Sequence, residues 1–201
     1  LQLNGAVFYQ ELEDFQQNSF DGLNFSVRNA ATVTGQGIEL DYMFAPNEHW
    51  LFSGGITLQE VEYDEFKNAS PTAWQDPLSV QDLSGESVLF TSDTTLSGLI
   101  SYTTPINDSL KFTAATTYSY SSEYFTGQDN DPITEQDAYW VFNLNFSVGA
   151  QDDSWEVAVW GKNVTDEEIY NIAFDTTFQR GSYSAYIRDP MTWGLTGKLK
   201  F

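Results

Sequence analysis

Apolar and polar residues alternate with a period of two along much of this chain, and no other feature restricts its fold as strongly. In the last eleven residues (191–201), one set of alternate positions is apolar or small, and the other is polar or glycine. Successive side chains of a strand point to opposite faces. This segment is therefore expected to be a strand with one apolar and one wet face. The apolar set is Met191, Trp193, Leu195, Gly197, Leu199 and Phe201.

Seven further segments repeat this pattern. They lie at about 2–13, 38–44, 50–59, 88–105, 110–121, 139–148 and 155–160. The pattern is weaker in 88–105 and in 2–13, where Val7 and Tyr9 compete with Ala6 and Phe8 for the apolar face. No segment carries a capped apolar stripe with the 3.6-residue period of a helix. The sequence therefore predicts an all-β chain of about eight strands.

The connections between these segments alternate in length. Short turns are expected at 45–49, 105–109 and 151–154, where Pro, Asn, Asp and Ser gather. Longer polar segments lie between them, at about 15–31, 66–87, 127–136 and 170–187. In an antiparallel meander every short turn then lies at one end of the sheet and every long loop at the other. Both the start of the chain and Phe201 are expected at the short-turn end.

Aromatic residues make up 16% of the chain, although the mean hydropathy is only −0.36. No stretch approaches the roughly 20 apolar residues of a membrane helix, but strands of about ten residues cross a bilayer when they tilt. Strands in lipid must satisfy their backbone hydrogen bonds with neighbouring strands. The pattern therefore predicts an antiparallel up-and-down transmembrane β-barrel segment with tight periplasmic turns and long extracellular loops.

A soluble barrel or sandwich with its apolar face turned inward is the alternative for such alternation. The size of the apolar side chains argues against it, because the interior of a small barrel is filled by modest side chains. The apolar face here is instead rich in Trp, Phe and Tyr. Alternation alone does not decide between the two.

Aromatic residues near the strand ends predict two girdles at the two membrane interfaces. The residues expected to face lipid there are Trp50, Phe52, Trp140, Phe142, Trp155 and Trp193. Charged residues on the opposite strand faces are expected to point into the lumen. These are Glu39, Asp41, Lys111, Glu156, Lys162 and Lys198.

The charge balance is strongly acidic, with 8 Lys and Arg against 29 Asp and Glu and a net charge of −21. This excludes nucleic acid as a partner. The chain has no cysteine and one histidine, His49, which argues against thiolate, metal and triad chemistry. We expect no catalytic residue, no metal ligand and no cofactor, and hence no enzyme.

Two acidic segments, 127–132 (GQDNDP) and 165–168 (TDEE), bring carboxylates close together. Oxygen ligands of this kind suit Ca²⁺, but neither spacing forms a complete calcium loop. We interpret both as solvated acidic loops. Aromatic residues in the long loops permit two interpretations, because they could stack on an external ligand or pack against neighbouring loops. These residues are Trp74, Tyr124, Phe125 and Phe178.

Four segments resemble a known family, and together they run from end to end of the chain. They are GAVFYQELEDFQ (5–16), RNAATVTGQGIELDYMFAP (28–46), WGKNVTDEEIY (160–170) and RDPMTWGLTGKLKF (188–201). They are similar, in this order and spacing, to strand and turn motifs in the C-terminal part of the β-barrel of a TonB-dependent outer-membrane receptor.

The resemblance implies that residues 1–201 are the C-terminal segment of a 22-stranded barrel, with the plug domain and the N-terminal strands absent. It implies TonB-dependent active transport of a scarce nutrient (ferric siderophore, cobalamin or oligosaccharide) across the outer membrane of a Gram-negative bacterium. The implied partners are outer-membrane lipid, a small-molecule ligand, and the TonB complex through the missing N-terminal region. The barrel-assembly machinery is implied to read the C-terminal strand, with Phe201 as its signal.

A complete eight-stranded outer-membrane barrel with a structural or adhesive role is the alternative. Its even strand number and co-located ends are compatible with closure. The lumen-facing charged residues would then interlock in a packed interior.

Overall fold

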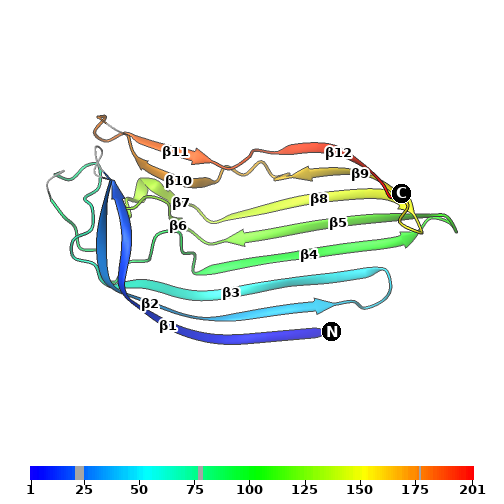
Figure 1. Cartoon of the computed structure of the whole chain (residues 1–201), viewed down its shortest axis with the longest axis horizontal. Helices are drawn as coiled ribbons and strands as arrows, with labels where there is room; N and C mark the ends of the chain where they lie inside the picture. Colours follow the sequence, from blue (N-terminus) through cyan, green and yellow to red (C-terminus); the bar gives the residue numbers. More distant parts are fainter. Residues whose placement is uncertain (21–24, 77–78, 177) are drawn as a thin grey trace.

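One antiparallel sheet of eight strands dominates the computed structural model, which describes residues 1–20, 25–76, 79–176 and 178–201 (Figure 1). Each strand follows its sequence neighbour across the sheet except where short strands of the loops intervene. The eight strands expected from alternation are confirmed. In spatial order they are β1 (Gln2–Phe20), β2 (Phe25–Phe44), β3 (Trp50–Glu65), β4 (Thr94–Pro105), β5 (Leu110–Ser121), β8 (Tyr139–Ala150), β9 (Trp155–Lys162) and β12 (Thr192–Leu199).

Four short strands lie in the long connections and form two separate two-stranded sheets. β6 (Tyr124–Phe125) pairs with β7 (Glu135–Gln136), and β10 (Tyr170–Asp175) pairs with β11 (Tyr183–Ile187). A 3₁₀ turn, Pro132–Thr134, precedes β7. Within the described part of the chain, no helix is long and apolar enough to cross a membrane.

The predicted asymmetry of the connections is confirmed. The short turns after β2, β4 and β8 lie at one end of the sheet together with both termini, and the long connections lie at the other end (Figure 1). Asparagine side chains organise two of the turns. The side-chain oxygen of Asn47 (Oδ1) accepts the backbone N–H groups of His49 and Trp50 at 3.0 and 3.1 Å. Asn107 accepts those of Ser109 and Leu110 in the same way. Such side chains stabilise tight turns by imitating a backbone acceptor.

Three expectations about element boundaries are wrong. Residues 15–31 do not form a loop, because β1 and β2 continue as a paired hairpin up to Phe20 and Phe25. The segment 170–187 contains the β10–β11 hairpin, and β4 begins at Thr94, later than expected.

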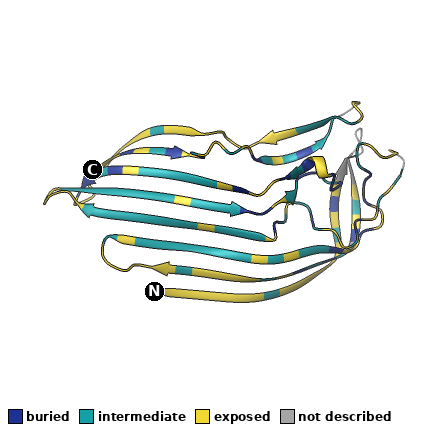
Figure 2. Ribbon diagram, turned by 180° about the vertical axis from the view of Figure 1, so that it is seen from behind, coloured by how far each residue is buried: buried dark blue, intermediate teal, exposed yellow. Residues whose placement is uncertain are grey.

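The strand register separates the sheet into an apolar and a polar face. Val7 lies opposite Ile38, and Ile38 lies opposite Leu58, whereas Ala6 lies opposite Glu39. This resolves the ambiguity in the first strand in favour of Val7. Several of the large apolar side chains are exposed, including Leu195 at 76% and Leu199 at 70%, as the exposed segments of β1 and β12 in Figure 2 illustrate. In the described structure the apolar face is therefore open at these positions, which differs from the buried apolar face of the soluble interpretation.

On β2 and β3 the apolar band, the row of outward apolar side chains, ends at Ile38 and Leu58. Beyond it, toward the long connections, the polarity of the two faces reverses. On the outer side, Glu60 lies opposite Gln36, and Glu62 lies opposite Thr34. On the inner side, Val33 lies opposite Tyr63, and the 66–93 connection folds over both of them. A hydrophobic core forms there. It consists of Ala30, Val33, Tyr63, Phe66, Ala69, Leu83 and Val88, with Phe15 and Val61 packed against it.

We expect Phe66→Ala to loosen the 66–93 connection, because Phe66 is only 2% exposed and its ring lies 5.0 Å from that of Tyr63. Removing a buried phenylalanine costs about 3–5 kcal/mol. The amides of Leu83, Gly85 and Val88 donate to backbone carbonyls of β3 and of Phe66, which follows it. Their hydrogen exchange measures the local free energy of opening.

Phe90→Ala is the matched control, since Phe90 lies in the same connection but is 46% exposed. Equal acceleration of exchange in both variants would contradict the assignment of the core.

Candidate functional site

The six residues expected in the girdles all lie on the apolar face. At the short-turn end, the Trp50 ring stacks on Phe52, with ring centres 5.5 Å apart, and lies 4.7 Å from Tyr102. Trp155 is at the same end, opposite Leu199. The aromatic side chains of the adjacent strands β3 and β4 thus form one band, and Trp155 lies at the same end of the sheet on β9.

A second aromatic band lies nearer the long loops. The Trp140 ring stacks on Phe142 at 5.8 Å and lies 4.9 Å from the ring of Tyr120. Trp193 covers Gly161 on the neighbouring strand so closely that a Cβ at Gly161 would lie 2.6 Å from the indole. The geometry suits two interfaces separated by an apolar zone.

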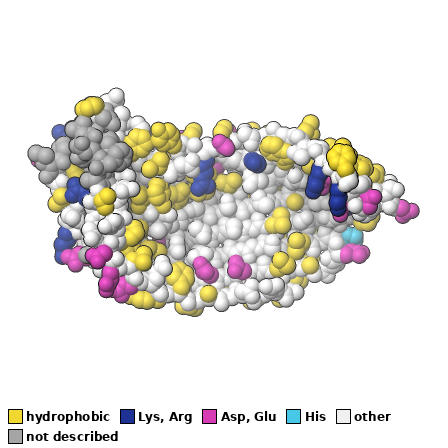
Figure 3. Space-filling view, viewed as in Figure 1, with side chains coloured by type: hydrophobic (Ala, Val, Ile, Leu, Met, Phe, Trp, Pro, Cys, Tyr) yellow, Lys and Arg dark blue, Asp and Glu magenta, His cyan; other side chains and the backbone are white. Residues whose placement is uncertain are grey.

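The six charged residues expected in the lumen all lie on the polar face, but they do not join each other. Lys111 pairs with Asp153 in the short turn after β8, and Glu156 accepts a hydrogen bond from Ser147 at 3.2 Å. Glu156 also lies opposite Lys198. Among the described residues no ion pair links any two of the six. A broad stretch of surface without acidic or basic side chains lies across the middle of this face (Figure 3).

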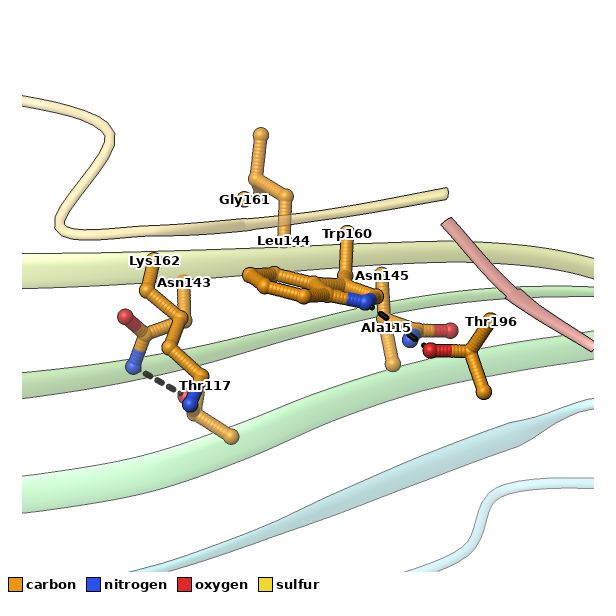
Figure 4. A pocket seen from close by; sticks show the side chains of 9 residues that line it. All are labelled: Ala115, Thr117, Asn143, Leu144, Asn145, Trp160, Gly161, Lys162 and Thr196. Carbon is orange, nitrogen blue, oxygen red and sulfur yellow. Dashed lines mark hydrogen bonds between the residues drawn. The ribbon is translucent and has the colours of Figure 1, made fainter. Parts of the chain in front are cut away.

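One hollow of the polar face has a volume of about 530 Å³ and lies over β5, β8, β9 and β12. Its lining residues are Ala115, Thr117, Asn143, Leu144, Asn145, Trp160, Gly161, Lys162 and Thr196. Figure 4 shows Lys162, Asn143 and Thr117 on one side of the Trp160 ring and Asn145 and Thr196 on the other. We call this hollow the wall pocket.

Trp160 forms the platform of the wall pocket. Its indole lies against Gly194, the residue directly opposite on β12, where a Cβ would collide with the ring. Its Nε1–H donates to Thr196 Oγ1 at 3.0 Å. The Lys162 ammonium lies 5.5 Å from the ring centre, within the range of a cation–π interaction. The platform and its cation therefore come from two residues that share one face of β9.

Asn143 is fixed in orientation by two hydrogen bonds. Its Oδ1 accepts the backbone N–H of Asn163 at 2.9 Å, and its Nδ2 donates to Thr117 Oγ1 at 3.0 Å. A second hollow of about 520 Å³ shares Thr117 and Asn143 and reaches Asp41 on β2. The two hollows thus form a shallow trough with a cation at one end and a carboxylate at the other.

The acidic segment 127–132 is buried, so its interpretation as a solvated loop is wrong. Asp129 and Asp131 are 8% and 4% exposed. Gln81 from the 66–93 connection donates to the Asp129 carbonyl at 2.6 Å, and the Tyr183 hydroxyl donates to the Asp131 carboxylate at 2.7 Å. Three connections therefore meet at this segment. The other acidic segment, 165–168, lies mostly at the surface.

Burial, followed by the charges of Asp175 and Asp131, raises the pKa of Asp129 to about 6. Burial and the charge of Asp131 also raise the pKa of Asp175. Within the described residues, no group of three or more acidic or histidine side chains is placed to hold a metal ion. The segment is therefore a joint between three loops, and the ionised carboxylate of Asp129 destabilises this joint.

The loop aromatic residues fall into two groups, one packed against neighbouring residues and one exposed at the surface. Tyr124 packs at 6.4 Å from Tyr139, and Phe125 lies beside it in β6. Trp74 and Phe178 are instead 61% and 87% exposed. Arg180 holds Trp74 in place by donating to its carbonyl at 3.1 Å.

Several residues of the wall pocket were not singled out from the sequence. The polar-face positions of Trp160 and Lys162 are visible in the alternation of one strand. Thr117, Asn143 and Thr196 come from three other strands, and only the register of the sheet brings them beside Trp160.

Comparison with known proteins identifies the family. A family model described as TonB dependent receptor-like, beta-barrel matches residues 1–164. The chain belongs to this family. No curated protein matches the sequence.

Solved TonB-dependent receptors share the fold. The chain resembles the ferric yersiniabactin uptake receptor FyuA of Yersinia pestis with a TM-score of 0.76 and 14% identity, covering 99% of this chain and 27% of that one. It resembles the ferric-catecholate import receptor Fiu of E. coli K12 with a TM-score of 0.66 and 16% identity, covering 99% and 25%. For the ferripyoverdine receptor of the outer membrane of Pseudomonas aeruginosa, the TM-score is 0.60 and the identity 16%, with the same coverage. The chain thus spans about a quarter of the length of these receptors.

We expect Asp129→Asn to change how the stability of the loop joint depends on pH. Because the folded pKa of Asp129 lies above its ordinary value of 3.8, its stabilising contribution is complete below about pH 4 and is lost as pH rises to about 6. The variant avoids this loss and should be more stable at pH 7 by roughly 3 kcal/mol, at 1.36 kcal/mol per pKa unit.

Hydrogen exchange of the Thr126 and Thr134 amides, which lie in the joint, measures this difference at pH 4 and pH 7 after correction for the intrinsic exchange rates. Parallel pH profiles of the wild type and the variant would contradict the assigned electrostatic cost.

Proposed function

We propose that this chain forms the C-terminal wall and part of the ligand-facing loops of an outer-membrane transporter that works with TonB. The observation that carries the proposal is the eight-stranded sheet with an exposed apolar face, a polar opposite face and long connections at one end only. The family match over residues 1–164 supports it. The cargo is a scarce nutrient of the class of a ferric siderophore, a cobalamin or an oligosaccharide.

Each part of the chain has a separate task in this proposal. The apolar face and the two aromatic bands meet lipid, the polar face lines the passage, and the long loops capture the ligand from outside. Energy relayed through TonB rearranges the plug, which belongs to the part of the receptor outside this chain. We assign the chain no catalytic step, because transport changes no covalent bond of the cargo.

The edge strands are where the remaining barrel would join. β1 pairs only with β2, and β12 pairs only with β9, among the described strands. In a 22-stranded barrel both edges pair with strands outside this segment, which removes the open edges that lipid does not tolerate. Phe201, at the end of the chain beyond β12, is proposed to serve the barrel-assembly machinery.

The complete eight-stranded barrel is the weaker proposal. An open sheet does not by itself separate the two, because a fragment can close or stay open. The absence of ion pairs among the six lumen-facing charged residues in the described structure favours a wide lumen over an interlocked one.

A pair of neighbouring lysine substitutions tests which face meets lipid. Ile100 lies on the apolar face opposite Phe52, and Leu99 lies on the polar face opposite Thr117. A lysine facing lipid near mid-membrane costs about 2–4 kcal/mol, so Ile100→Lys should lower the free energy of unfolding in lipid vesicles by that amount. Leu99→Lys should change it by less than about 1 kcal/mol. The reverse order would exclude the proposed orientation.

A growth experiment tests transport. We expect that deleting the gene slows growth when one of the three nutrient classes is the limiting source, and that the defect equals that of a strain lacking TonB. Uptake of the labelled nutrient measures the effect directly. Uptake that continues unchanged without TonB would rule out the proposed mechanism.

A further inference from the structure

Side-chain amides tie the loop joint, the segment 127–132, to the 66–93 connection. Gln81 of that connection donates to the Asp129 carbonyl at 2.6 Å, and Asn130 of the joint donates to a carbonyl of the connection at 2.9 Å. Asp129 and Asn130 are both 8% exposed. The connection therefore separates from the joint only when both hydrogen bonds break.

A second pair of hydrogen bonds ties the β10–β11 hairpin to the joint. Tyr183 on β11 donates to the Asp131 carboxylate at 2.7 Å, and the Ala173 N–H on β10 donates to the carbonyl of Thr126, just before the joint, at 3.2 Å. Asp131 and Ala173 are 4% and 3% exposed, so these bonds are shielded from water. The 66–93 connection, the joint and the hairpin thus form one packed unit.

A small hollow at the joint brings two carboxylates together. Its lining residues are Ser70, Gln128, Asp129, Phe174 and Asp175. The hollow has a volume of about 10 Å³, which is room for about one water molecule. Asp129 belongs to the joint and Asp175 to β10, so the hollow lies on the boundary between two loops. Ser70, which the 66–93 connection contributes, is uncharged.

The charged and titratable groups at or beside the joint are mostly acidic. They are Asp129 and Asp131 of the joint, Asp175 of β10, Tyr183 of β11 and Arg28 of β2. Arg28 lies opposite Gln17, which bonds to the joint, but its guanidinium donates to a carbonyl of the 66–93 connection at 2.8 Å. The two neighbouring carboxylates that act on Asp129 both oppose its ionisation. When two carboxyl groups share a buried site, one of them tends to keep its proton.

We propose that a proton shared by Asp129 and Asp175 holds the loop joint closed, so that the 66–93 connection, the joint and the β10–β11 hairpin close together in acid and open together near neutral pH. The proton removes the repulsion across the hollow and lets one carboxyl group donate a hydrogen bond to the other, directly or through one water molecule. Burial, followed by the neighbouring charges, raises the pKa of Asp129 from 3.8 to about 6. The stabilisation is therefore complete below about pH 4 and is lost as pH rises through 6.

The inference rests on the proposed function in one respect, because these connections belong to the loops proposed to capture the ligand from outside. It adds a control of that step. Loops that close together in acid retain a ligand, and loops that open together near neutral pH exchange it.

Hydrogen exchange of the complete receptor in detergent at pH 4 and pH 7, corrected for intrinsic rates, tests the proposal. The reporters are the amides of Leu83, Thr126 and Ala173, one from each part of the unit. We expect exchange at all three to rise together by about 50- to 100-fold, as a folded pKa of about 6 against 3.8 predicts. Asp129→Asn should abolish the rise at all three, although it changes only one part. Asp137→Asn, at an exposed position of the same connection, is the matched control and should keep the rise.

Asp175→Asn should reduce the rise without abolishing it, because burial, the larger cause, still raises the pKa of Asp129 in this variant. A rise confined to Thr126, or a full rise in the Asp129→Asn variant, would overturn the proposal. So would wild-type exchange that loses its pH dependence when calcium chloride is added, because a cation rather than a proton would then neutralise the carboxylates. Exchange reports on the loops and the growth experiment on uptake, so failure of the closure and failure of transport are told apart.

Discussion

The hydrogen-bonded ladder between neighbouring strands is the constraint on which the rest of this structure depends. Lipid offers no partner for backbone N–H and C=O groups, so each strand must lie beside another in register. Because side chains alternate, a shift by one residue would move every side chain to the opposite face. The observed register keeps Ile38, Leu58 and their neighbours together on one face, and Glu39 on the other. The aromatic bands and the wall pocket both result from this single set of pairings.

Alternation has a different meaning inside and beyond the apolar band. Within the band, the outward positions carry apolar side chains such as Ile38 and Leu58. Beyond it, the same positions of β3 carry Glu60 and Glu62, while the inward positions Val61 and Tyr63 face a core made by the 66–93 connection. Desolvation and the nearby charges, Glu60 foremost, raise the pKa of Glu62, so this outer surface tolerates repulsion that water screens. One strand therefore carries outward apolar side chains along one part and outward charged side chains along the next, with the same backbone geometry.

Local patterns were predictable from the sequence, whereas features that depend on distant parts of the chain were not. The eight strands were predictable because alternation within the band is strong, and the turns because Asn47 and Asn107 are typical turn residues. The continuation of β1 and β2 through 15–31 was not, since its polar residues match a loop in composition and its pairing depends on the partner strand. Burial of 127–132 was missed for a similar reason, because Gln81 and Tyr183 approach it from distant parts of the chain.

The pairing of β9 with β12 shows how two adjacent positions can serve two different surfaces. Trp160 lies opposite Gly194 on the polar face, and Gly161 lies opposite Trp193 on the apolar face. Each indole uses the space left by the glycine across from it, an arrangement that lets a large ring lie flat on a sheet. Trp193 thereby contributes to the band proposed to meet lipid, and Trp160 forms the platform under Lys162. A Cβ at either glycine would displace an indole, so the proposed membrane surface and the wall pocket depend on the same two pairs of residues.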